Sequence, residues 1–278
     1  MQTSGHYRGY DARRNLEPME TPRVASLLDF RGKVALVTGA GGGLGRGIAA
    51  RFAEAGAAVA AHFRQSAGEA NALVLEITKA GGRAIAAAGD LTQAADVERL
   101  VAQVRESFGR LDVLVNNAGT YPVAGLLEMT AAQWDEVIAS NLRTTFLCTQ
   151  AAARQMAGQG GGAIVNITSI EAENPAPGHS HYNAAKAGVL MYTRAAAGEL
   201  AAHGIRVNAV APGLIWREGI EEAWPDGVAR WKRAAPLGRL GTAADVADAC
   251  LFLASPAARW ITGASLTVDG GVITHQIF

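Results

Sequence analysis

The chain has 278 residues, of which 49% are hydrophobic and 6% aromatic, and its 25 basic and 25 acidic side chains give a formal net charge of zero. This composition is typical of a chain that buries one large core, so we expect a single α/β domain. The pI near 7.0 and the absence of a Lys/Arg run argue against a nucleic-acid partner or a membrane partner. The sequence contains no uncharged apolar run of roughly 18 residues, so we expect no membrane span. Small-molecule chemistry is therefore the favoured class of function.

Residues 1–29 are predicted to form a mobile N-terminal extension, and residues 30–278 the folded domain. The extension lacks the apolar core of about 7–15 residues found in signal peptides, so a cytoplasmic location is expected. Packing of residues 24–28 on a neighbouring subunit is the alternative role. Cys148 and Cys250 lie in Ala/Leu-rich helical patterns without metal-ligand or CxxC spacing. We interpret them as core side chains in a reducing compartment, and we expect no metal.

A glycine-rich turn connects an apolar strand at residues 34–38 to a helical pattern at residues 46–53. Glycines in this position let the backbone approach a pyrophosphate, and the N–H groups that begin the helix face the phosphates. Glycine alone fits any tight turn, but here the required strand precedes it and the required helix follows. The predicted dinucleotide-binding residues of this turn are Gly39, Gly43, Leu44 and Gly45.

A candidate active site lies between Gly161 and Ala187. A strand at residues 163–167 is followed by Ser169, and a helix is expected to begin near His181. Tyr182 and Lys186 are four residues apart and therefore share one face of that helix. A nearby ammonium group favours phenolate and is expected to lower the pKa of Tyr182 towards neutrality, which suits proton transfer. Ser169 is placed to polarise a substrate carbonyl, although a Tyr/Lys pair also occurs as surface decoration.

Three motifs together resemble the short-chain dehydrogenase/reductase family over residues 30–271. They are the glycine spacing TGxxxGxG, the sequence NNAG at residues 116–119, and a Ser thirteen residues before the Tyr of YxxxK. The resemblance implies a doubly wound Rossmann fold with a seven-stranded parallel sheet. It also implies hydride transfer between a nicotinamide cofactor and a carbonyl or secondary alcohol.

By this resemblance Asn141 completes a catalytic set with Ser169, Tyr182 and Lys186. Asn141 lies in a helical segment from Ala131 to Met156, which it is implied to distort so that a backbone carbonyl holds a water between Lys186 and solvent. Tyr182 and Lys186 are also implied to contact the cofactor, Lys186 through the nicotinamide ribose. Further implied cofactor contacts follow strands expected at residues 83–88, 111–115 and 205–210; they are Asp90, Leu91, Asn117, Ala118, Gly119, Pro212, Gly213 and Ile215.

The residue after the second strand, at residues 58–63, is expected to choose the cofactor. An acidic side chain there accepts hydrogen bonds from the ribose of NAD, whereas this chain has Arg64. Arg64 predicts a preference for NADP(H), with NAD(H) as the alternative. Two points favour the alternative: Gly42 stands where many NADP-preferring members of the family have a basic residue, and a solvated Arg64 would contact no phosphate.

Residues 216–233, rich in Trp, Glu and Arg, are interpreted as an irregular lid over the substrate. The alternative is a solvent-exposed surface segment whose tryptophans pack inward. Arg217 stands where relatives commonly have a Thr that binds the cofactor, so we expect that contact to be lost and a cation to be offered to substrate or cofactor instead.

The predicted function is an NADP(H)-preferring oxidoreductase acting on a small-molecule carbonyl or alcohol. The alternatives are a 3-oxoacyl-carrier-protein reductase and a catalytically silent NADP-binding regulator on the same fold. The family pairs the helices at residues 131–156 and 182–202 across a two-fold axis, so a homo-oligomer is expected, either a tetramer or a dimer.

Overall fold

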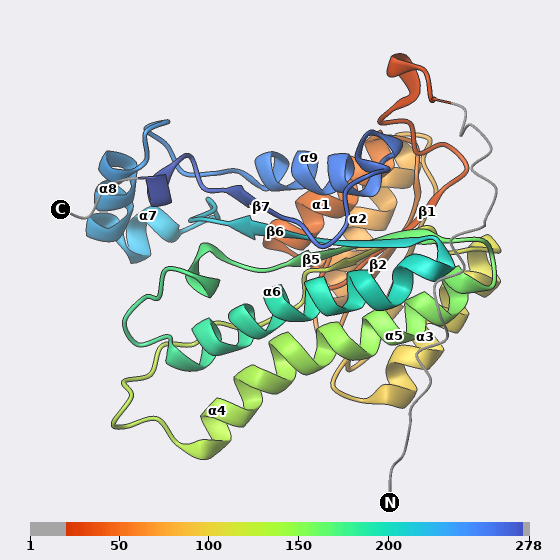
Figure 1. Ribbon diagram of the computed structural model, residues 1–278. Coiled ribbons are helices and arrows are strands. Elements are labelled where there is room, and N and C mark those ends of the chain that lie inside the picture. The colour runs from red at the N-terminus through yellow and green to blue at the C-terminus, as the bar shows by residue number, and fades with distance from the viewer. Residues whose placement is uncertain (1–20, 275–278) are drawn as a thin grey trace, which may run out of the picture.

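Seven parallel strands form one sheet in the order β3-β2-β1-β4-β5-β6-β7 in the computed structural model, which describes residues 21–274 (Figure 1). The strands are β1 (Val34–Val37), β2 (Ala58–Phe63), β3 (Ala84–Ala88), β4 (Val113–Asn116), β5 (Gly162–Ile167), β6 (Ile205–Pro212) and β7 (Ser265–Val268). Most of the predicted extension, residues 1–20, lies outside the described residues. The predicted seven-stranded α/β fold is confirmed.

The central strands are continuous apolar runs because helices cover both faces of the sheet. All four residues of β1 and all four of β4 are buried. β1 pairs with β2 on one side and with β4 on the other, so the strand order reverses at this point. Ligands of doubly wound folds bind outside the carboxyl ends of the strands at this reversal, and the candidate site residues follow these strands.

Two layers of helices enclose the sheet (Figure 1). Helices α1, α2 and α9 contribute to the core on one face, and α3, α5 and α6 to the core on the other. The helices are α1 (Gly43–Glu54), α2 (Ala67–Lys79), α3 (Ala94–Phe108), α4 (Ala131–Ile138), α5 (Thr144–Ala157), α6 (Ser180–Leu200), α7 (Ile220–Ala223), α8 (Pro225–Ala234) and α9 (Ala243–Ala254). Within residues 21–274 we find no helix with the length and apolar character needed to cross a membrane.

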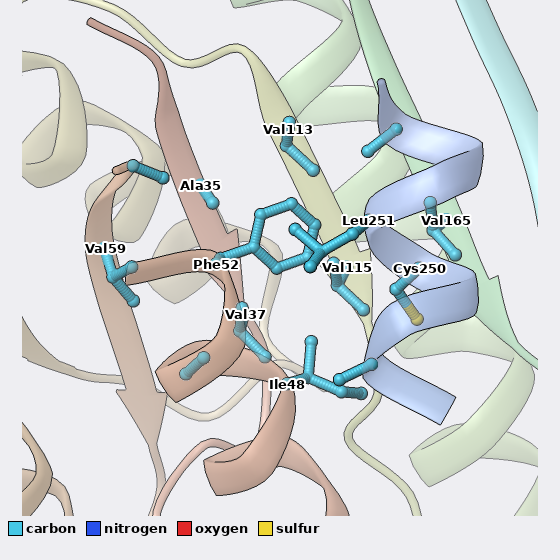
Figure 2. Close-up of a cluster of buried hydrophobic side chains, with 14 of the residues drawn as sticks. Ala35, Val37, Ile48, Phe52, Val59, Val113, Val115, Val165, Cys250 and Leu251 are labelled. Carbon is cyan, nitrogen blue, oxygen red and sulfur yellow. The ribbon is translucent and has the colours of Figure 1, made fainter. Parts of the chain in front are cut away.

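The core under α1 and α9 centres on Phe52 and Leu251, which lie over strands β1 and β4 (Figure 2). The two helices approach closely at Gly47, where a Cβ would lie 2.3 Å from the Cβ of Ala243. Cys250 is fully buried in this core, and Cys148 is 1% exposed in the opposite one. Burial raises the pKa of the Cys148 thiol to about 12. Both cysteines are core side chains, as predicted.

Several predicted boundaries are corrected by the structure. The expected helix over residues 131–156 is interrupted by a π-helical turn at Ala139–Arg143 between α4 and α5. The strand expected at residues 205–210 is longer in the structure, because β6 continues to Pro212. The predicted irregular lid is wrong in its secondary structure, because most of it forms α7 and α8. Pro225 begins α8 with the φ angle that a first helical turn requires.

Candidate active site

The glycine-rich turn folds back on its own helix, and this requires glycine at two positions. Gly39 has a φ of +66°, and a Cβ there would lie 3.1 Å from atoms of Asn117 and Ala118. A Cβ at Gly45 would lie only 2.2 Å from the carbonyl oxygen of Gly39. Any side chain at Gly45 would therefore push the turn away from α1.

The start of α1 fits a bound pyrophosphate. Gly42 is the N-cap and has no side chain, so the first N–H groups of the helix are not capped by a side chain at that position. Nothing lies within 4 Å of the Cβ position of Gly42 or Gly43, so this side of the turn is open. Unpartnered N–H groups at an open helix N-terminus are an anion site, which supports the predicted roles of Gly43, Leu44 and Gly45.

The NNAG sequence after β4 ties the sheet to the glycine turn. The Asn117 side-chain amide donates to the carbonyls of Thr38 at 2.9 Å and Gly39 at 3.3 Å. The backbone N–H groups of Asn117 and Ala118 both donate to the Thr38 hydroxyl. Thr38 was not singled out from the sequence, although it is the threonine of the TGxxxGxG motif. These bonds hold the end of β4 against the predicted cofactor turn.

Ser169 and Tyr182 meet beyond the end of β5. The Ser169 hydroxyl oxygen accepts the N–H of Glu171 at 3.1 Å, which leaves its own proton free to be donated. Burial raises the pKa of Tyr182, and a hydrogen bond with Ser169 partly opposes this shift. The Tyr182 ring is flanked edge-on by Tyr121 and His179, with ring centroids 6.1 and 5.9 Å away. Tyr182 therefore carries its proton in this geometry.

Lys186 lies one turn further along α6, as predicted, but it does not contact the Tyr182 hydroxyl. Its Nζ donates to the carbonyl of Ile167 at 2.8 Å and lies 5.5 Å from the Tyr182 ring centroid. Only 5% of Lys186 is exposed, and burial lowers its pKa to about 8. The expectation that the ammonium lowers the pKa of Tyr182 is wrong for this geometry, because desolvation dominates at both groups.

Asn141 sits in the π-helical turn with 1% of its surface exposed. Its amide donates to the carbonyls of Thr120 at 2.8 Å and Val137 at 3.0 Å, while its Oδ1 has no hydrogen-bond partner among the described residues. A Cβ at Gly119 would lie 2.3 Å from that oxygen, which explains the glycine of NNAG. The predicted helix distortion is therefore present at Asn141, and its backbone carbonyl accepts the Thr145 hydroxyl at 2.7 Å. The water relay remains a prediction.

Two polar side chains stand at the predicted adenosine end of the site. Arg64 is exposed directly after β2, and its charge acts on Asp90 after β3. Hydrogen bonds from Thr92 hold the pKa of Asp90 below its usual value, and Arg64 adds to this effect. Leu91, also predicted as a cofactor contact, is 5% exposed and belongs to the core under α3.

The segment between Pro212 and the lid packs closely on the end of β6 and on the lid. A Cβ at Gly213 would lie 2.6 Å from the Trp231 ring, and Ile215 forms a bridge with Gly241. Trp231 packs inward with Ile220, Val228 and Leu240.

The other lid tryptophans, Trp216 and Trp224, are 53% and 48% exposed. The Arg217 guanidinium lies 5.9 Å over the ring of Tyr121, which in turn contacts Tyr182. The lid is thereby linked to the predicted proton donor.

Comparison with known proteins identifies the family. A family model described as enoyl-(acyl carrier protein) reductase matches residues 39–273. The 3-oxoacyl-[acyl-carrier-protein] reductase of Synechocystis sp. is 42% identical over 242 residues, which cover 87% of this chain and 97% of the relative. The chain belongs to the short-chain dehydrogenase/reductase family. A relative with the same activity name from Staphylococcus epidermidis is also 42% identical, over 240 residues that cover 86% of this chain and 98% of the relative.

Solved structures of short-chain dehydrogenases share the fold. A short-chain type dehydrogenase/reductase from Mycobacterium marinum is 38% identical with a TM-score of 0.85, covering 90% of this chain and 99% of that one. A 7α-hydroxysteroid dehydrogenase, complexed with NADH and 7-oxo glycochenodeoxycholic acid, is 36% identical with a TM-score of 0.86, covering 90% and 98%. This short-chain dehydrogenase/reductase is therefore an oxidoreductase with a nicotinamide cofactor, and the predicted enzyme class is confirmed.

Proposed function

We propose that the protein is an NADP(H)-preferring oxidoreductase that interconverts a small-molecule ketone and a secondary alcohol. The observation that carries this proposal is the convergence of Ser169, Tyr182 and Lys186 beyond the end of β5. They lie at the carboxyl ends of the strands, where the glycine turn also lies. All three are at least partly desolvated, and the pKa values of Tyr182 and Lys186 are shifted by burial. Side chains with shifted pKa values at the carboxyl ends of the strands favour a catalytic site.

The nicotinamide supplies or accepts the hydride when it is bound. Ser169 and Tyr182 donate hydrogen bonds to the substrate oxygen. Because burial keeps Tyr182 protonated, its hydroxyl transfers a proton to that oxygen as negative charge develops. Lys186, anchored on the carbonyl of Ile167, is the cation beside Tyr182 that stabilises the phenolate left after transfer.

We assign the phosphates of the cofactor to the N-terminus of α1 and the 2′-phosphate to Arg64. Arg64 is exposed, and no carboxylate within residues 21–274 is hydrogen-bonded to its guanidinium, which supports this second assignment. Asp90 and Leu91 would adjoin the adenine, while Asn117, Ala118 and Gly119 would line the cleft. Tyr182, Lys186 and the segment from Pro212 to Ile215 would face the nicotinamide half.

The charge of the lid supports a free small molecule as the substrate. Residues 216–233 contain four acidic and four basic side chains, which do not make the basic surface that an acidic carrier protein would need. The second candidate is reduction of a 3-oxoacyl group on acyl carrier protein, supported by the activity of the relatives that are 42% identical. Arg217, which lies over the ring of Tyr121, would favour a substrate with an electronegative group, whether that substrate is free or carrier-bound.

A substrate panel followed by nicotinamide absorbance tests the proposal. The purified protein is given NADPH or NADH with ring ketones, linear ketones, a 3-oxoacyl thioester in free and carrier-bound forms, and an enoyl thioester. We expect reduction of a free ketone, faster with NADPH. A strong preference for the carrier-bound 3-oxoacyl group would establish the second candidate, and reduction of the enoyl thioester alone would overturn the carbonyl assignment.

We further propose a homo-oligomer assembled through α5 and α6, and a reducing cytoplasmic location that fits the two unpaired buried thiols. Phe146 on α5 and Met191 on α6 are 41% and 60% exposed, and apolar side chains exposed on these two helices support an interface there. Light scattering at micromolar concentration should give the mass of a dimer or tetramer. A monomeric mass would refute the assembly.

A further inference from the structure

His62, at the carboxyl end of β2, holds the glycine turn at two points. Its backbone carbonyl accepts the N–H of Ala40 at 2.8 Å, and its ring Nδ1 accepts the N–H of Gly39 at 3.1 Å. The other ring nitrogen, Nε2, lies 3.1 Å from the carbonyl of Gly89. The side chain is 3% exposed. A single buried imidazole therefore connects the turn after β1 to the loop after β3.

These contacts define the protonation state of the ring. A nitrogen that accepts from Gly39 carries no proton, and a nitrogen facing the carbonyl of Gly89 must donate one. His62 is therefore the neutral tautomer with its proton on Nε2. A second proton, taken from solvent, has only Nδ1 to bind. It would set N–H against the N–H of Gly39, and the hydrogen bond that holds the turn would be lost.

The charged side chains near His62 come from the loops after β2 and β3 and from helices α1, α2 and α3. Asp90, from the loop after β3, favours the charged ring, but burial outweighs it and lowers the pKa of His62 below its ordinary value of 6.5. Strands β1 and β3, on either side of β2, carry no charged side chain. Arg64 follows β2 and acts on Asp90, whose backbone N–H donates to Asp96 of α3. On the helices above, Arg46 of α1 pairs with Glu76 of α2.

We propose that His62 is a positioning residue for the cofactor turn, and that the protein binds its dinucleotide only while the His62 ring is neutral. The inference rests on the nicotinamide cofactor of the proposed function. It predicts that dinucleotide affinity decreases as the pH is lowered through the pKa of His62, because protonation of His62 releases Gly39 from the conformation that brings α1 to the phosphates. Below the pKa of His62, the decrease approaches about tenfold for each pH unit.

The test is calorimetric titration with NAD⁺ and with NADP⁺ from about pH 8 down to the lowest pH at which the protein stays folded, because burial places the pKa of His62 below 6.5. NAD⁺ is essential, because the 2′-phosphate of NADP⁺ itself titrates near pH 6, roughly as other phosphate monoesters do. The His62→Asn variant keeps an acceptor for Gly39 but cannot be protonated. The His62→Phe variant keeps a ring and loses the acceptor. His203→Asn is the matched control, since His203 is exposed in the turn after α6.

We expect wild type and His203→Asn to lose NAD⁺ affinity together as the pH falls, and His62→Asn to show a flat profile. His62→Phe should bind at least several-fold more weakly than wild type at neutral pH; if it does not fold, the His62→Asn profile decides alone. A wild-type slope in His62→Asn, or wild-type affinity in His62→Phe, would overturn the role of His62. Failure of the wild type to bind either dinucleotide at neutral pH would instead overturn the cofactor site itself.

Discussion

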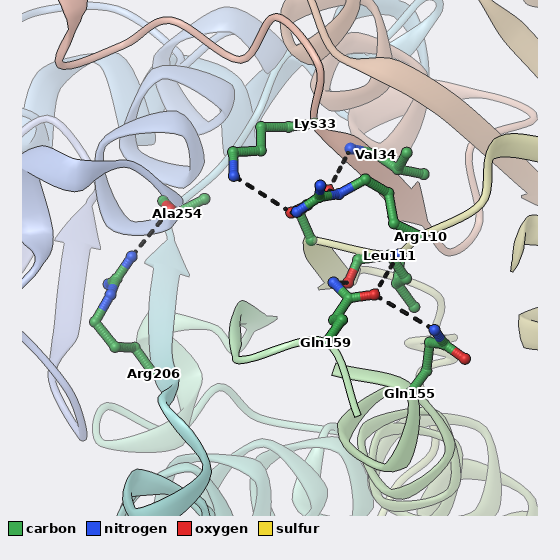
Figure 3. A network of polar contacts seen from close by, with 9 residues as sticks. Lys33, Val34, Arg110, Leu111, Gln155, Gln159, Arg206 and Ala254 are labelled. Atoms are coloured by element: carbon green, nitrogen blue, oxygen red, sulfur yellow. Dashed lines mark hydrogen bonds and ion pairs between the residues drawn. The ribbon is translucent and has the colours of Figure 1, made fainter. Parts of the chain in front are cut away.

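The polar side chains at the amino end of the sheet are more completely hydrogen-bonded than Asn141 and Lys186 of the candidate catalytic set at the carboxyl end. At the amino end, Asp112 accepts the N–H of Val34 at 2.9 Å and the Arg110 guanidinium at 2.6 and 2.7 Å, with Lys33 at 3.5 Å (Figure 3). Gln159 binds both the N–H and the carbonyl of Leu111. These polar side chains each have several partners.

Arg206 belongs to the same end. Its guanidinium donates to the carbonyls at the end of α9 and in the turns after it, including that of Ala254 (Figure 3). In the catalytic set at the carboxyl end, by contrast, the part of the chain that the structure describes offers Oδ1 of Asn141 no hydrogen-bond partner and Nζ of Lys186 a single carbonyl. Satisfied buried groups stabilise a fold, whereas incompletely satisfied ones retain the capacity to bind and to exchange protons. The polar cluster at the amino end therefore stabilises the fold, whereas Asn141 and Lys186 keep unused hydrogen-bonding capacity for chemistry.

Substitution of Tyr182 should give the largest effect on activity. Tyr182→Phe keeps the ring between Tyr121 and His179 and removes only the hydroxyl that transfers the proton. We expect turnover to fall by about 10²- to 10⁴-fold, the range for loss of a general acid, with dinucleotide binding retained. Nicotinamide absorbance gives the rate and calorimetry the affinity. Full activity in this variant would contradict the proposed proton donor.

Substitution of Asp112 should give the largest effect on stability. Asp112→Ala leaves the Val34 N–H and the Arg110 charge without their acceptor. Breaking charged hydrogen bonds of this kind costs about 2–4 kcal/mol of unfolding free energy, with the lower end favoured because Arg110 is half exposed. Denaturant titration measures the change, and turnover per folded molecule should not alter. Glu106→Ala, on the exposed face of α3, is the control and should change stability by less than about 0.5 kcal/mol.

At the carboxyl end, removal of a charge should stabilise the fold. The pKa of Lys186 is about 8 in the folded chain and 10.5 without burial, so below pH 8 the folded state holds a desolvated ammonium. This shift corresponds to about 3 kcal/mol, reduced by the lost bond to Ile167. We expect Lys186→Met to raise the unfolding free energy at neutral pH by about 1–3 kcal/mol and to abolish turnover.

The pH dependence provides the check on Lys186. Between about pH 8 and 10.5 the unfolded chain binds a proton that the folded chain has released, so wild-type stability from this group rises with pH. The difference between wild type and Lys186→Met should therefore close across that window. Lys79→Met, at the exposed end of α2, should show no such convergence. A variant less stable than wild type at every pH would mean that Lys186 stabilises the fold.

The smallest expected effect tests cofactor choice. Arg64→Ala should weaken NADPH binding at least several-fold, because a charge-assisted hydrogen bond contributes roughly 1.5–3 kcal/mol and exposure favours the low end. NADH affinity should hardly change, since NADH has no 2′-phosphate. Equal weakening of both cofactors would show that Arg64 packs on the adenine, and unchanged NADPH affinity would leave it in solvent.

Local patterns in the sequence determined most of the fold and the membership of the candidate site. The bounds of β2 were predicted correctly, because a short apolar run is a property of neighbouring residues. The glycine turn, NNAG and the Tyr182–Lys186 spacing were also readable, since each lies within a few residues. Pro225 at the start of α8 was the available signal that the lid is helical, and the predicted irregular structure did not take it into account.

Only the tertiary structure decided how those residues act on one another. The bond from Gly39 to His62 joins residues 23 apart, and the Arg217 contact with Tyr121 joins the lid to the loop after β4. The direction of the Tyr182 pKa was likewise set by packing, because burial outweighed the neighbouring lysine that the sequence spacing had emphasised. Desolvation and long-range hydrogen bonds depend on what surrounds a group in space, and no local pattern carries that information.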